Sequence, residues 1–540
     1  MKVIGVSLGT CIHVAGLLNF LKLCEAEGYS SSFLGSAVSP ERLIEAIKKE
    51  RPDLVAISYR LDPSVAERLF EEVKKRLEKN NISDVRFVFG GTAPVAEIAK
   101  KSGLFECVFD GTQSIDEIRA YLKGESVKRT EEKFPQDLVS RIEKSYPYPI
   151  LRHHFGLPSL KETVKGARKI ARAQVLDVLS LGPDQNAQES FFRPDEMKPG
   201  QDGAGGVPLR KPGDLRQIHK ATRCANHPLL RCYSGTRDLV KWAKMLKETI
   251  NIAWGAVPLC WYSLLDGRST RPLEEAIREN QKAIRWYASQ EIPVEVNESH
   301  QWSLRDAHDS LAVAMAFLAA YNAKNLGVRY YVSQYMFNTP PGTSPVMDLG
   351  KMLAKIELIE SLHDENFTTF RQVRAGPASF LPDLNIAKGQ LAASGLLSLA
   401  LKPHILHVGG YCEAHHIVTP VELIESCKII HGMIHISLQD FPDLLNDKRI
   451  QKRKKELIIE ANVLLDALGK GKSEPLCNPE VLTQAIEQGL LDAPHLKNNP
   501  HAKGRVITRM IEGKCCAVDG STGKVISEKE RIELLKEKKK

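Results

Sequence analysis

Strand-like and helix-like segments alternate over the first 125 residues, and this alternation is the feature that most restricts the fold. A helix is predicted from Pro40, after the N-cap residue Ser39, and another from Pro63, after Asp62. The order predicts an open, doubly wound parallel sheet of the Rossmann-like α/β class, whose ligands bind beyond the carboxyl ends of the strands. The predicted strands are 3–7, 54–58, 85–89 and 107–109.

The rest of the chain is predicted to contain a linker, a barrel and a small final piece. Residues 126–160 are interpreted as a linker because a charged stretch leads into Tyr146-Pro147-Tyr148-Pro149. Residues 161–440 again alternate strand and helix, which predicts a (β/α)₈ barrel of the TIM type. Residues 441–540 are predicted to be a C-terminal α+β piece, helical with a hairpin around 519–523. The predicted barrel strands are 175–181, 229–233, 253–261, 294–297, 330–337, 370–373 and 404–408.

Composition narrows the classes of protein. Of the 540 residues, 26% are charged and 43% hydrophobic, which is ordinary globular usage and argues against wholesale disorder. No run of about 18 apolar residues predicts a membrane span. The basic runs at 452–455 and 538–540 are interpreted as a solvated helix face and a tail, so no nucleic-acid partner is expected. Eleven scattered cysteines without a disulfide framework predict a reduced, cytoplasmic protein. The expected partner is a small-molecule substrate, and a homodimer is left open.

Glycines and polar residues follow three predicted strands of the first domain. Because carboxyl ends of parallel strands share one edge of the sheet, these residues are candidates for one binding site. Glycines there allow a large planar ligand to approach the backbone closely. The residues are Cys11, His13 and Gly16 after the first strand, Ser58 and Leu61 after the second, and Gly90, Gly91 and Thr92 after the third.

This pattern resembles the cobalamin-binding domain shared by methylmalonyl-CoA mutase, glutamate mutase and methionine synthase. That family carries Asp-x-His-x-x-Gly, then Ser-x-Leu, then Gly-Gly. The resemblance implies that His13 ligates the cobalt of cobalamin and that the nucleotide tail enters between Ser58 and the glycines. Two positions depart from the family: Cys11 replaces the aspartate, and one extra residue separates Ser58 from Leu61. The family's carboxylate raises the basicity of the imidazole, a role that a thiol fills poorly.

Polar residues also gather at the predicted exits of the barrel strands, which indicates a site on the carboxyl face of the barrel. The candidate clamps for a carboxylate are Arg231, Arg268, Arg371 and Arg374, because a guanidinium binds a carboxylate as a planar fork. Glu295, Glu298 and Glu413 are candidates to hold an amino group or to act as a base.

Three other polar features complete the barrel prediction. His300 is assigned to the catalytic set, and Asn338 to the cofactor-binding set. His415 and His416 invite a zinc interpretation together with Glu413, but their spacing does not follow a usual zinc motif.

A cobalamin domain followed by a barrel resembles the adenosylcobalamin-dependent mutases, most nearly a glutamate mutase whose small and large subunits are fused. The resemblance implies a radical isomerase for a small amino or carboxylic acid. Its cofactor, adenosylcobalamin, breaks its Co–C bond homolytically so that the deoxyadenosyl radical abstracts a substrate hydrogen. The corrin ring is then expected between the sheet edge and the barrel mouth. Glutamate mutase has an Arg-His-Gly run where this chain has Asn297-Glu298-Ser299-His300, so its carboxylate-binding arginine is not carried over.

Three alternatives remain open. A corrinoid-dependent methyltransferase commonly has helices before the cobalamin domain, whereas this sequence starts at the first strand. A B12 aminomutase assisted by pyridoxal phosphate needs a Schiff-base lysine, and the sequence nominates none. A non-catalytic cobalamin sensor or carrier does not explain a barrel of this size.

Overall fold

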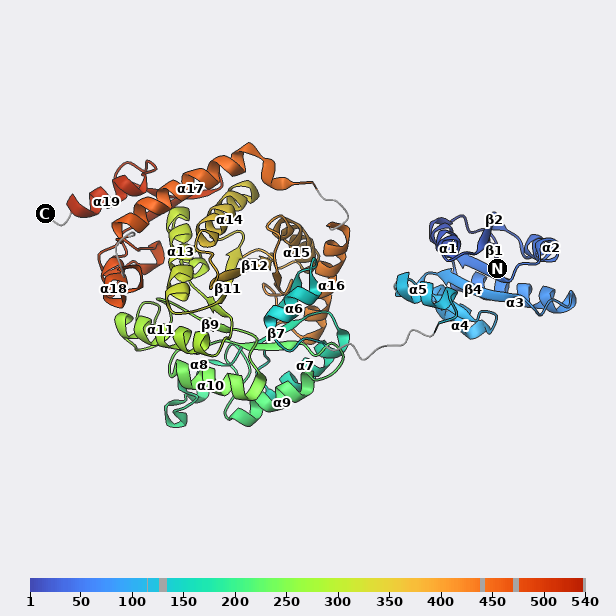
Figure 1. Ribbon diagram of the computed structural model, residues 1–540, viewed down its shortest axis with the longest axis horizontal. Helices are drawn as coiled ribbons and strands as arrows, with labels where there is room; N and C mark the ends of the chain where they lie inside the picture. Colours follow the sequence, from blue (N-terminus) through green and yellow to red (C-terminus); the bar gives the residue numbers. More distant parts are fainter. Residues whose placement is uncertain (114, 126–133, 438–441, 470–474, 538–540) are drawn as a thin grey trace. The chain divides into compact units, whose positions relative to one another are not determined.

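The computed structural model describes residues 1–113, 115–125, 134–437, 442–469 and 475–537. The chain divides into two compact units, residues 1–133 and 134–540 (Figure 1). Among the described residues, no helix is both long and apolar enough to cross a membrane.

Unit 1 is a five-stranded parallel sheet with strand order β2-β1-β3-β4-β5. This confirms the predicted doubly wound α/β fold. The order reverses between β1 and β3, and ligands of such sheets bind at the carboxyl ends of the strands beside this point. The elements are β1 (Lys2–Leu8), α1 (Ala15–Ala26), β2 (Ser30–Val38), α2 (Pro40–Glu50), β3 (Leu54–Tyr59), α3 (Pro63–Lys79), β4 (Arg86–Gly91), α4 (Ala93–Ser102), β5 (Cys107–Phe109) and α5 (Ile115–Leu122).

The helix starts of unit 1 follow the predicted capping residues. The Ser39 hydroxyl accepts from the Arg42 N–H at 3.3 Å, and the Asp62 carboxylate accepts from two N–H groups of the first turn of α3. Each cap satisfies backbone donors that the helix itself leaves unpaired. Strand β2 was not predicted, because it lies at the sheet edge and only Val38 of its nine residues is fully buried.

Unit 2 contains eight parallel strands in the order β8-β7-β6-β13-β12-β11-β10-β9. Strands β13 and β6 pair, so the sheet curls into a nearly closed barrel, and this confirms the predicted fold class. Between β8 and β9 the Ala253 N–H donates to the Leu230 carbonyl at 2.8 Å. The strands are β6 (Ile150–Phe155), β7 (Val178–Leu181), β8 (Leu229–Cys232), β9 (Gly255–Val257), β10 (Val294–Val296), β11 (Tyr330–Met336), β12 (Thr368–Ala375) and β13 (Ile405–Val408).

Helices surround these strands, and Figure 1 shows them as an outer ring. Each strand leads into at least one helix before the next strand begins, as the (β/α)₈ pattern requires. The helices are α7 (Leu160–Ala173), α8 (Gln185–Ser190), α9 (Pro212–Thr222), α10 (Leu239–Ile250), α11 (Leu273–Ser289), α12 (Ser299–Ser303), α13 (Asp309–Asn325), α14 (Pro345–Glu360), α15 (Leu384–Leu399) and α16 (Pro420–Ser437).

The structure differs from the sequence prediction at the linker. Helix α6 (Leu138–Ser145) and strand β6 both lie inside the predicted linker 126–160, so the barrel begins at β6 and not after residue 160. The strand contains Arg152, His153 and His154, and the first two are buried. Because these polar residues point into the barrel, β6 lacks the apolar pattern by which a strand is recognised in a sequence.

Helix α6 covers the amino-terminal end of the barrel. Its Leu138 and Ile142 belong to a buried apolar cluster with residues near the amino ends of the strands, including Ile150, Val178 and Leu229. That end is therefore filled with apolar side chains. The polar side chains of the barrel gather at the other, carboxyl end.

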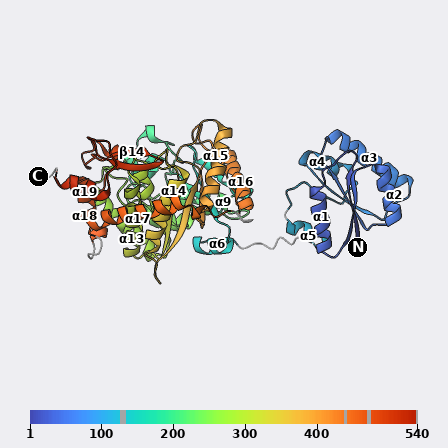
Figure 2. The same cartoon turned by 90° about the horizontal axis from the view of Figure 1, so that it is seen from above.

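The C-terminal piece contains α17 (Lys448–Ala467), α18 (Pro479–Glu487), a hairpin and α19 (Glu528–Glu537) (Figure 2). The hairpin prediction was wrong in register. Strands β14 (Ile507–Ile511) and β15 (Lys514–Val518) pair around Glu512-Gly513 and not around 519–523. Both turn residues have positive φ, 49° and 74°, which suits a two-residue hairpin turn. The predicted turn at 519–523 does reverse the chain: Val525 bridges Val518, and the Ile526 N–H donates to the Ala517 carbonyl at 3.0 Å.

Candidate functional site

The carboxyl edge of the unit 1 sheet brings the three predicted strand exits together. Ser7 of β1 is in register with Ser58 of β3, and Ser58 is in register with Gly90 of β4. His13 lies in the loop after β1, with its side chain exposed, and Ser58 is buried. These exits flank the point where the strand order reverses, so they form one surface at the place where this fold binds ligands.

Two glycines leave open space at this edge. A Cβ atom at Gly16 or Gly90 would have no heavy atom of the described residues within 4 Å. At Gly91 the same atom would lie 2.5 Å from the Tyr59 carbonyl oxygen, so the chain there passes too close for a side chain. Leu61, in the loop after β3, is 41% exposed, and Thr92 is the N-cap residue of α4. The edge thus offers an open, partly apolar cradle that suits a large planar cofactor.

The loop after β1 orients the His13 imidazole. The Cys11 sulfur is buried and lies 3.7 Å from His13 Nδ1, and the Ser7 hydroxyl donates to the Cys11 carbonyl at 2.8 Å. The thiol occupies the position where the family has a carboxylate, and Nε2 is the imidazole nitrogen left for a metal. The residues present therefore fit a cobalamin, with His13 as the candidate ligand of its cobalt.

Unit 2 holds a cavity of about 330 Å³ at the carboxyl end of the barrel. Of the predicted catalytic residues, Arg231, Arg268, Glu295 and His300 line it, whereas Glu298 and Glu413 do not. Asn338, predicted to bind cofactor, does not line it either. The other charged or polar lining residues include Arg152, His154, Gln188, Tyr233, Asn297, Gln301, Gln334, Gln372, Arg374 and His407.

Glu295 lies at the centre of the cavity floor and is fully buried. Its carboxylate accepts from Arg231 Nη2 at 2.8 Å, from Trp254 Nε1 at 2.6 Å and from Gln372 Nε2 at 3.2 Å, and Gln334 also donates to it. Burial alone would raise the pKa of Glu295, but the nearby arginines and the Trp254 N–H outweigh it, so the pKa is lowered. Glu295 is therefore an anion at neutral pH.

The cavity has more positive than negative charge. Arg231 is fully buried, and its Nε and Nη1 find no hydrogen-bond partner among the described residues. Arg152, from β6, donates to Ser180 Oγ at 2.7 Å and to Gln372 Oε1 at 3.1 Å, both uncharged groups. Two buried guanidinium groups therefore share one buried carboxylate, and the remaining positive charge favours an anionic ligand in the cavity.

The imidazoles of the cavity are neutral. Burial, together with neighbouring cations, lowers the pKa of His154 and of His407 well below the usual value. Burial also lowers the pKa of His300 to about 4. The Tyr233 hydroxyl and His154 Nε2 lie 3.0 Å apart, and the two rings stack. These groups supply neutral hydrogen bonds and do not add positive charge.

The rim of the cavity carries two more arginines. Arg374 Nη2 donates to the exposed carboxylate of Glu413 at 2.8 Å, so Glu413 acts here as the partner of a lining residue. Arg268 stacks over the Tyr262 ring, 4.8 Å from its centroid. Its guanidinium is about half exposed, so it lies where a ligand enters and not at the floor.

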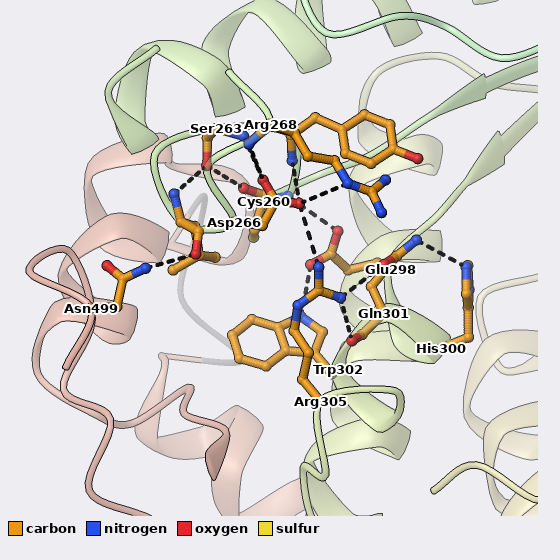
Figure 3. A network of polar contacts seen from close by, with 12 residues as sticks. Cys260, Ser263, Asp266, Arg268, Glu298, His300, Gln301, Trp302, Arg305 and Asn499 are labelled. Atoms are coloured by element: carbon orange, nitrogen blue, oxygen red, sulfur yellow. Dashed lines mark hydrogen bonds and ion pairs between the residues drawn. The ribbon is translucent and has the colours of Figure 1, made fainter. Parts of the chain in front are cut away.

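Glu298, predicted as catalytic, holds a loop together instead (Figure 3). One carboxylate oxygen accepts from the backbone N–H groups of Leu259 and Cys260 at 2.9 and 3.1 Å. The other accepts from Trp302 Nε1 at 2.8 Å. Burial raises the pKa of Glu298, and these donors oppose the rise. The carboxylate is occupied by the loop after β9 and by α12.

Asn338, predicted to bind cofactor, lies in the loop after β11. Its N–H donates to the Asp348 carboxylate at 2.5 Å, and its side chain donates to the Thr343 carbonyl at 3.4 Å. These bonds shape the loop before α14. The buried Lys355 of α14, whose pKa burial lowers to about 7, also lies outside the cavity lining.

Sequence reasoning missed Arg152 and His154 as site residues because β6 was placed in the linker. Of the other predicted clamps, Arg374 lines the cavity, whereas Arg371 does not and donates to Glu360. Gln334 and His407 also line it, but in the sequence nothing separates them from other polar residues near strand ends. The signal that could have found Arg152 is the Arg152-His153-His154 run between two apolar pairs, Ile150-Leu151 and Phe155 with Leu157. A charged run with apolar flanks is unusual for a linker.

Comparison with known proteins identifies unit 1. Residues 1–119 match the family model of the B12 binding domain, so the chain carries a cobalamin-binding domain. No match to the sequence was found among the curated proteins.

Two solved structures match part of the chain. A cobalamin-binding protein from Desulfitobacterium hafniense is 19% identical with a TM-score of 0.21, over 23% of this chain and 59% of that protein. The methanol:cobalamin methyltransferase complex from Methanosarcina barkeri is 22% identical with a TM-score of 0.19, over 22% of this chain and 51% of the other. The chain thus spans little more than half the length of either. Scores this low carry no inference about activity.

Proposed function

We propose that the protein is an adenosylcobalamin-dependent isomerase that acts on a small carboxylic or amino acid held in the barrel cavity. The B12-binding domain supports the cofactor class. The adenosyl form, the isomerase reaction and the substrate are inferred from the chemistry of the cavity and from the order of the two units.

The observation that carries the substrate class is the buried Arg231. Glu295 occupies only Nη2 of its guanidinium, and Nε and Nη1 are without a partner among the described residues. A substrate carboxylate that accepts from Nη1 would satisfy one of these buried donors by a charge-assisted hydrogen bond. Nε points to the other side of the guanidinium and would need a second acceptor, such as another polar atom of the substrate. Arg152, which has only neutral partners, would balance the added negative charge.

Glu295 supports the amino-acid branch of the proposal. It is an anion inside a cavity whose imidazoles are neutral, so it can hold a substrate ammonium group by charge. The Asn297 carbonyl oxygen Oδ1 and His300 Nδ1 are buried and also lack partners in the described part of the chain. Asn297 Oδ1 can accept a hydrogen bond from a substrate ammonium group, and His300 Nδ1 offers a further polar contact in the same cavity. A substrate with one carboxylate and one amino group matches this set.

Bound adenosylcobalamin would supply a carbon-centred radical that removes a hydrogen atom from the substrate. The work of the chain is then to position the substrate and to exclude water. Arg231 and Arg152 would orient the carboxylate at the floor of the barrel, and the apolar cluster under α6 closes the barrel below them. His13 would hold the cobalt from the sheet edge of unit 1.

The test incubates cobalamin-free protein separately with adenosylcobalamin and with methylcobalamin, each with a panel of small amino and carboxylic acids. We expect a paramagnetic signal only when adenosylcobalamin and one of the acids are both present. Transfer of the methyl group of methylcobalamin to an acceptor would contradict the isomerase and support a methyltransferase. A reaction that requires added pyridoxal phosphate would support the aminomutase.

His13→Ala tests the metal ligand. His13 is the only histidine among residues 1–133. In the electron paramagnetic resonance spectrum of bound, reduced cobalamin, we expect the nitrogen hyperfine splitting due to the imidazole to be lost in the variant. His495→Ala, an exposed histidine of unit 2, serves as the control and should leave the splitting intact. An unchanged spectrum in His13→Ala would remove this residue from cobalt ligation.

A further inference from the structure

We propose that Cys412, His416 and Glu422 form a zinc site at the carboxyl end of β13. One donor atom of each residue, a thiol sulfur, an imidazole nitrogen and a carboxylate oxygen, lies within 4.8 Å of the other two. These are the three donor types that zinc accepts in proteins. The inference does not depend on cobalamin or on the proposed reaction.

The donor atoms are close enough that small side-chain movements would let all three bind one zinc ion. Zinc bonds of 2.0–2.3 Å in tetrahedral geometry place neighbouring donor atoms roughly 3.3–3.7 Å apart. The atoms His416 Nε2 and Glu422 Oε1 are already 3.8 Å apart. Cys412 is fully buried at the base of the group, whereas His416 and Glu422 lie at the surface above it, so the site has an open side from which the ion can enter.

The second nitrogen of His416 is already oriented. His416 Nδ1 lies 2.9 Å from His415 Nδ1, which fits a hydrogen bond between the two imidazoles. A metal-binding histidine usually makes such a bond with the ring nitrogen that does not bind the metal. With Nδ1 engaged, Nε2 is the nitrogen that faces Glu422. His415 is therefore assigned as a positioning residue, and the fourth zinc position is left to water or another small ligand.

Glu422 has a structural role that must be separated from metal binding. One oxygen, Oε2, accepts from the Thr419 N–H at 3.1 Å and from the Thr419 hydroxyl, so it caps the start of α16. This cap explains the direction of the Glu422 side chain. The cap uses only Oε2, so Oε1 is the oxygen that faces His416 Nε2, and neither contact accounts for the thiol of Cys412 beside them.

A bound ion would tie the β13 exit to the rim of the barrel cavity. Cys412 directly precedes Glu413, whose carboxylate accepts from Arg374 of the cavity wall and from the Gly410 N–H at 3.0 Å. The ion would fix Cys412 to the first turn of α16 through Glu422. The exit loop between β13 and α16 would then hold Glu413 in place opposite Arg374.

The experiment measures zinc in the purified full-length chain, prepared without cobalamin, by mass spectrometry after dialysis against one equivalent of zinc. We expect one zinc per chain and, in X-ray absorption, a single sulfur neighbour at about 2.3 Å. Cys412→Ser and His416→Asn should each weaken zinc affinity by at least about 100-fold, which exceeds the 10–100-fold usual for loss of an outer partner. His415→Ala should fall within that smaller range.

Glu422→Gln separates the two roles of Glu422, because glutamine preserves the helix cap but is a poor zinc ligand. We expect it to lose zinc affinity without loss of helix content. Cys427→Ser and His435→Asn, a buried cysteine and an exposed histidine of α16, are matched controls and should keep one zinc per chain. Absence of zinc in the unaltered protein, or zinc that survives Cys412→Ser with its sulfur neighbour, would overturn the proposal.

Discussion

Glu295 and its arginine partners show how single residues set the charge of the barrel cavity. Within the described ranges, Glu295 is the one charged partner of the fully buried Arg231, so Glu295→Gln leaves that cation uncompensated. We expect a loss of about 3–5 kcal/mol in the free energy of unfolding of unit 2. All five tryptophans lie in unit 2, so urea unfolding followed by tryptophan fluorescence reports this unit alone.

The pH dependence of this effect has a definite sign. The pKa of Glu295 is lower in the folded protein than its ordinary value of 4.5. The ionised carboxylate therefore stabilises the fold above that value, and this stabilisation is lost as the pH falls through the folded pKa. Glu413→Gln, which removes an exposed partner of Arg374, is the control and should cost less than about 1 kcal/mol. Equal losses in both variants would contradict the role given to Glu295.

At the scale of elements, α6 is the part of the barrel that sequence reasoning overlooked. Leu138→Ala should cost about 2–5 kcal/mol, because it opens a cavity in the apolar cluster at the amino end of the barrel. Trp254 belongs to the same cluster, so its fluorescence should report the loosened packing directly. Glu143→Ala, on the exposed side of α6, should stay within about 0.5 kcal/mol. A neutral Leu138→Ala would mean that α6 does not close the barrel.

Strands β2 and β6 escaped prediction for opposite reasons. Strand β2 lies at an edge and is mostly half-exposed, so it has no apolar run to recognise. Strand β6 is buried, but Arg152 and His154 line the polar cavity of the barrel. The strand therefore lacks the run of apolar residues by which a buried strand is recognised in a sequence. The strands that were predicted, such as β1 and β3, are nearly continuous apolar runs because both faces of their sheet are covered.

At the scale of the whole molecule, each apolar cluster draws its residues from one unit only. Phe70→Ala, which removes a fully buried ring that packs on Phe89 and Phe105, should destabilise unit 1 by about 3–5 kcal/mol. In cobalamin-free protein we expect faster hydrogen exchange in β1, β3 and β4, with the tryptophan transition of unit 2 unchanged. A matching shift of that transition would show that the two units unfold together.

Local sequence determined the features that depend on neighbours along the chain. These are the alternation that makes both units α/β, the proline-bearing helix starts, and the His13, Ser58 and Gly90 positions that follow apolar strands. Tertiary structure decided what depends on distant residues. Arg152 and Glu295 are far apart in the sequence and line the same cavity only because the barrel closes. The Glu298 carboxylate binds a loop instead of lining that cavity. Closure of the barrel buries such residues in a low-dielectric interior. Whether a buried charge is available to a ligand then depends on its hydrogen-bond and ion-pair partners, which the residue type alone does not reveal.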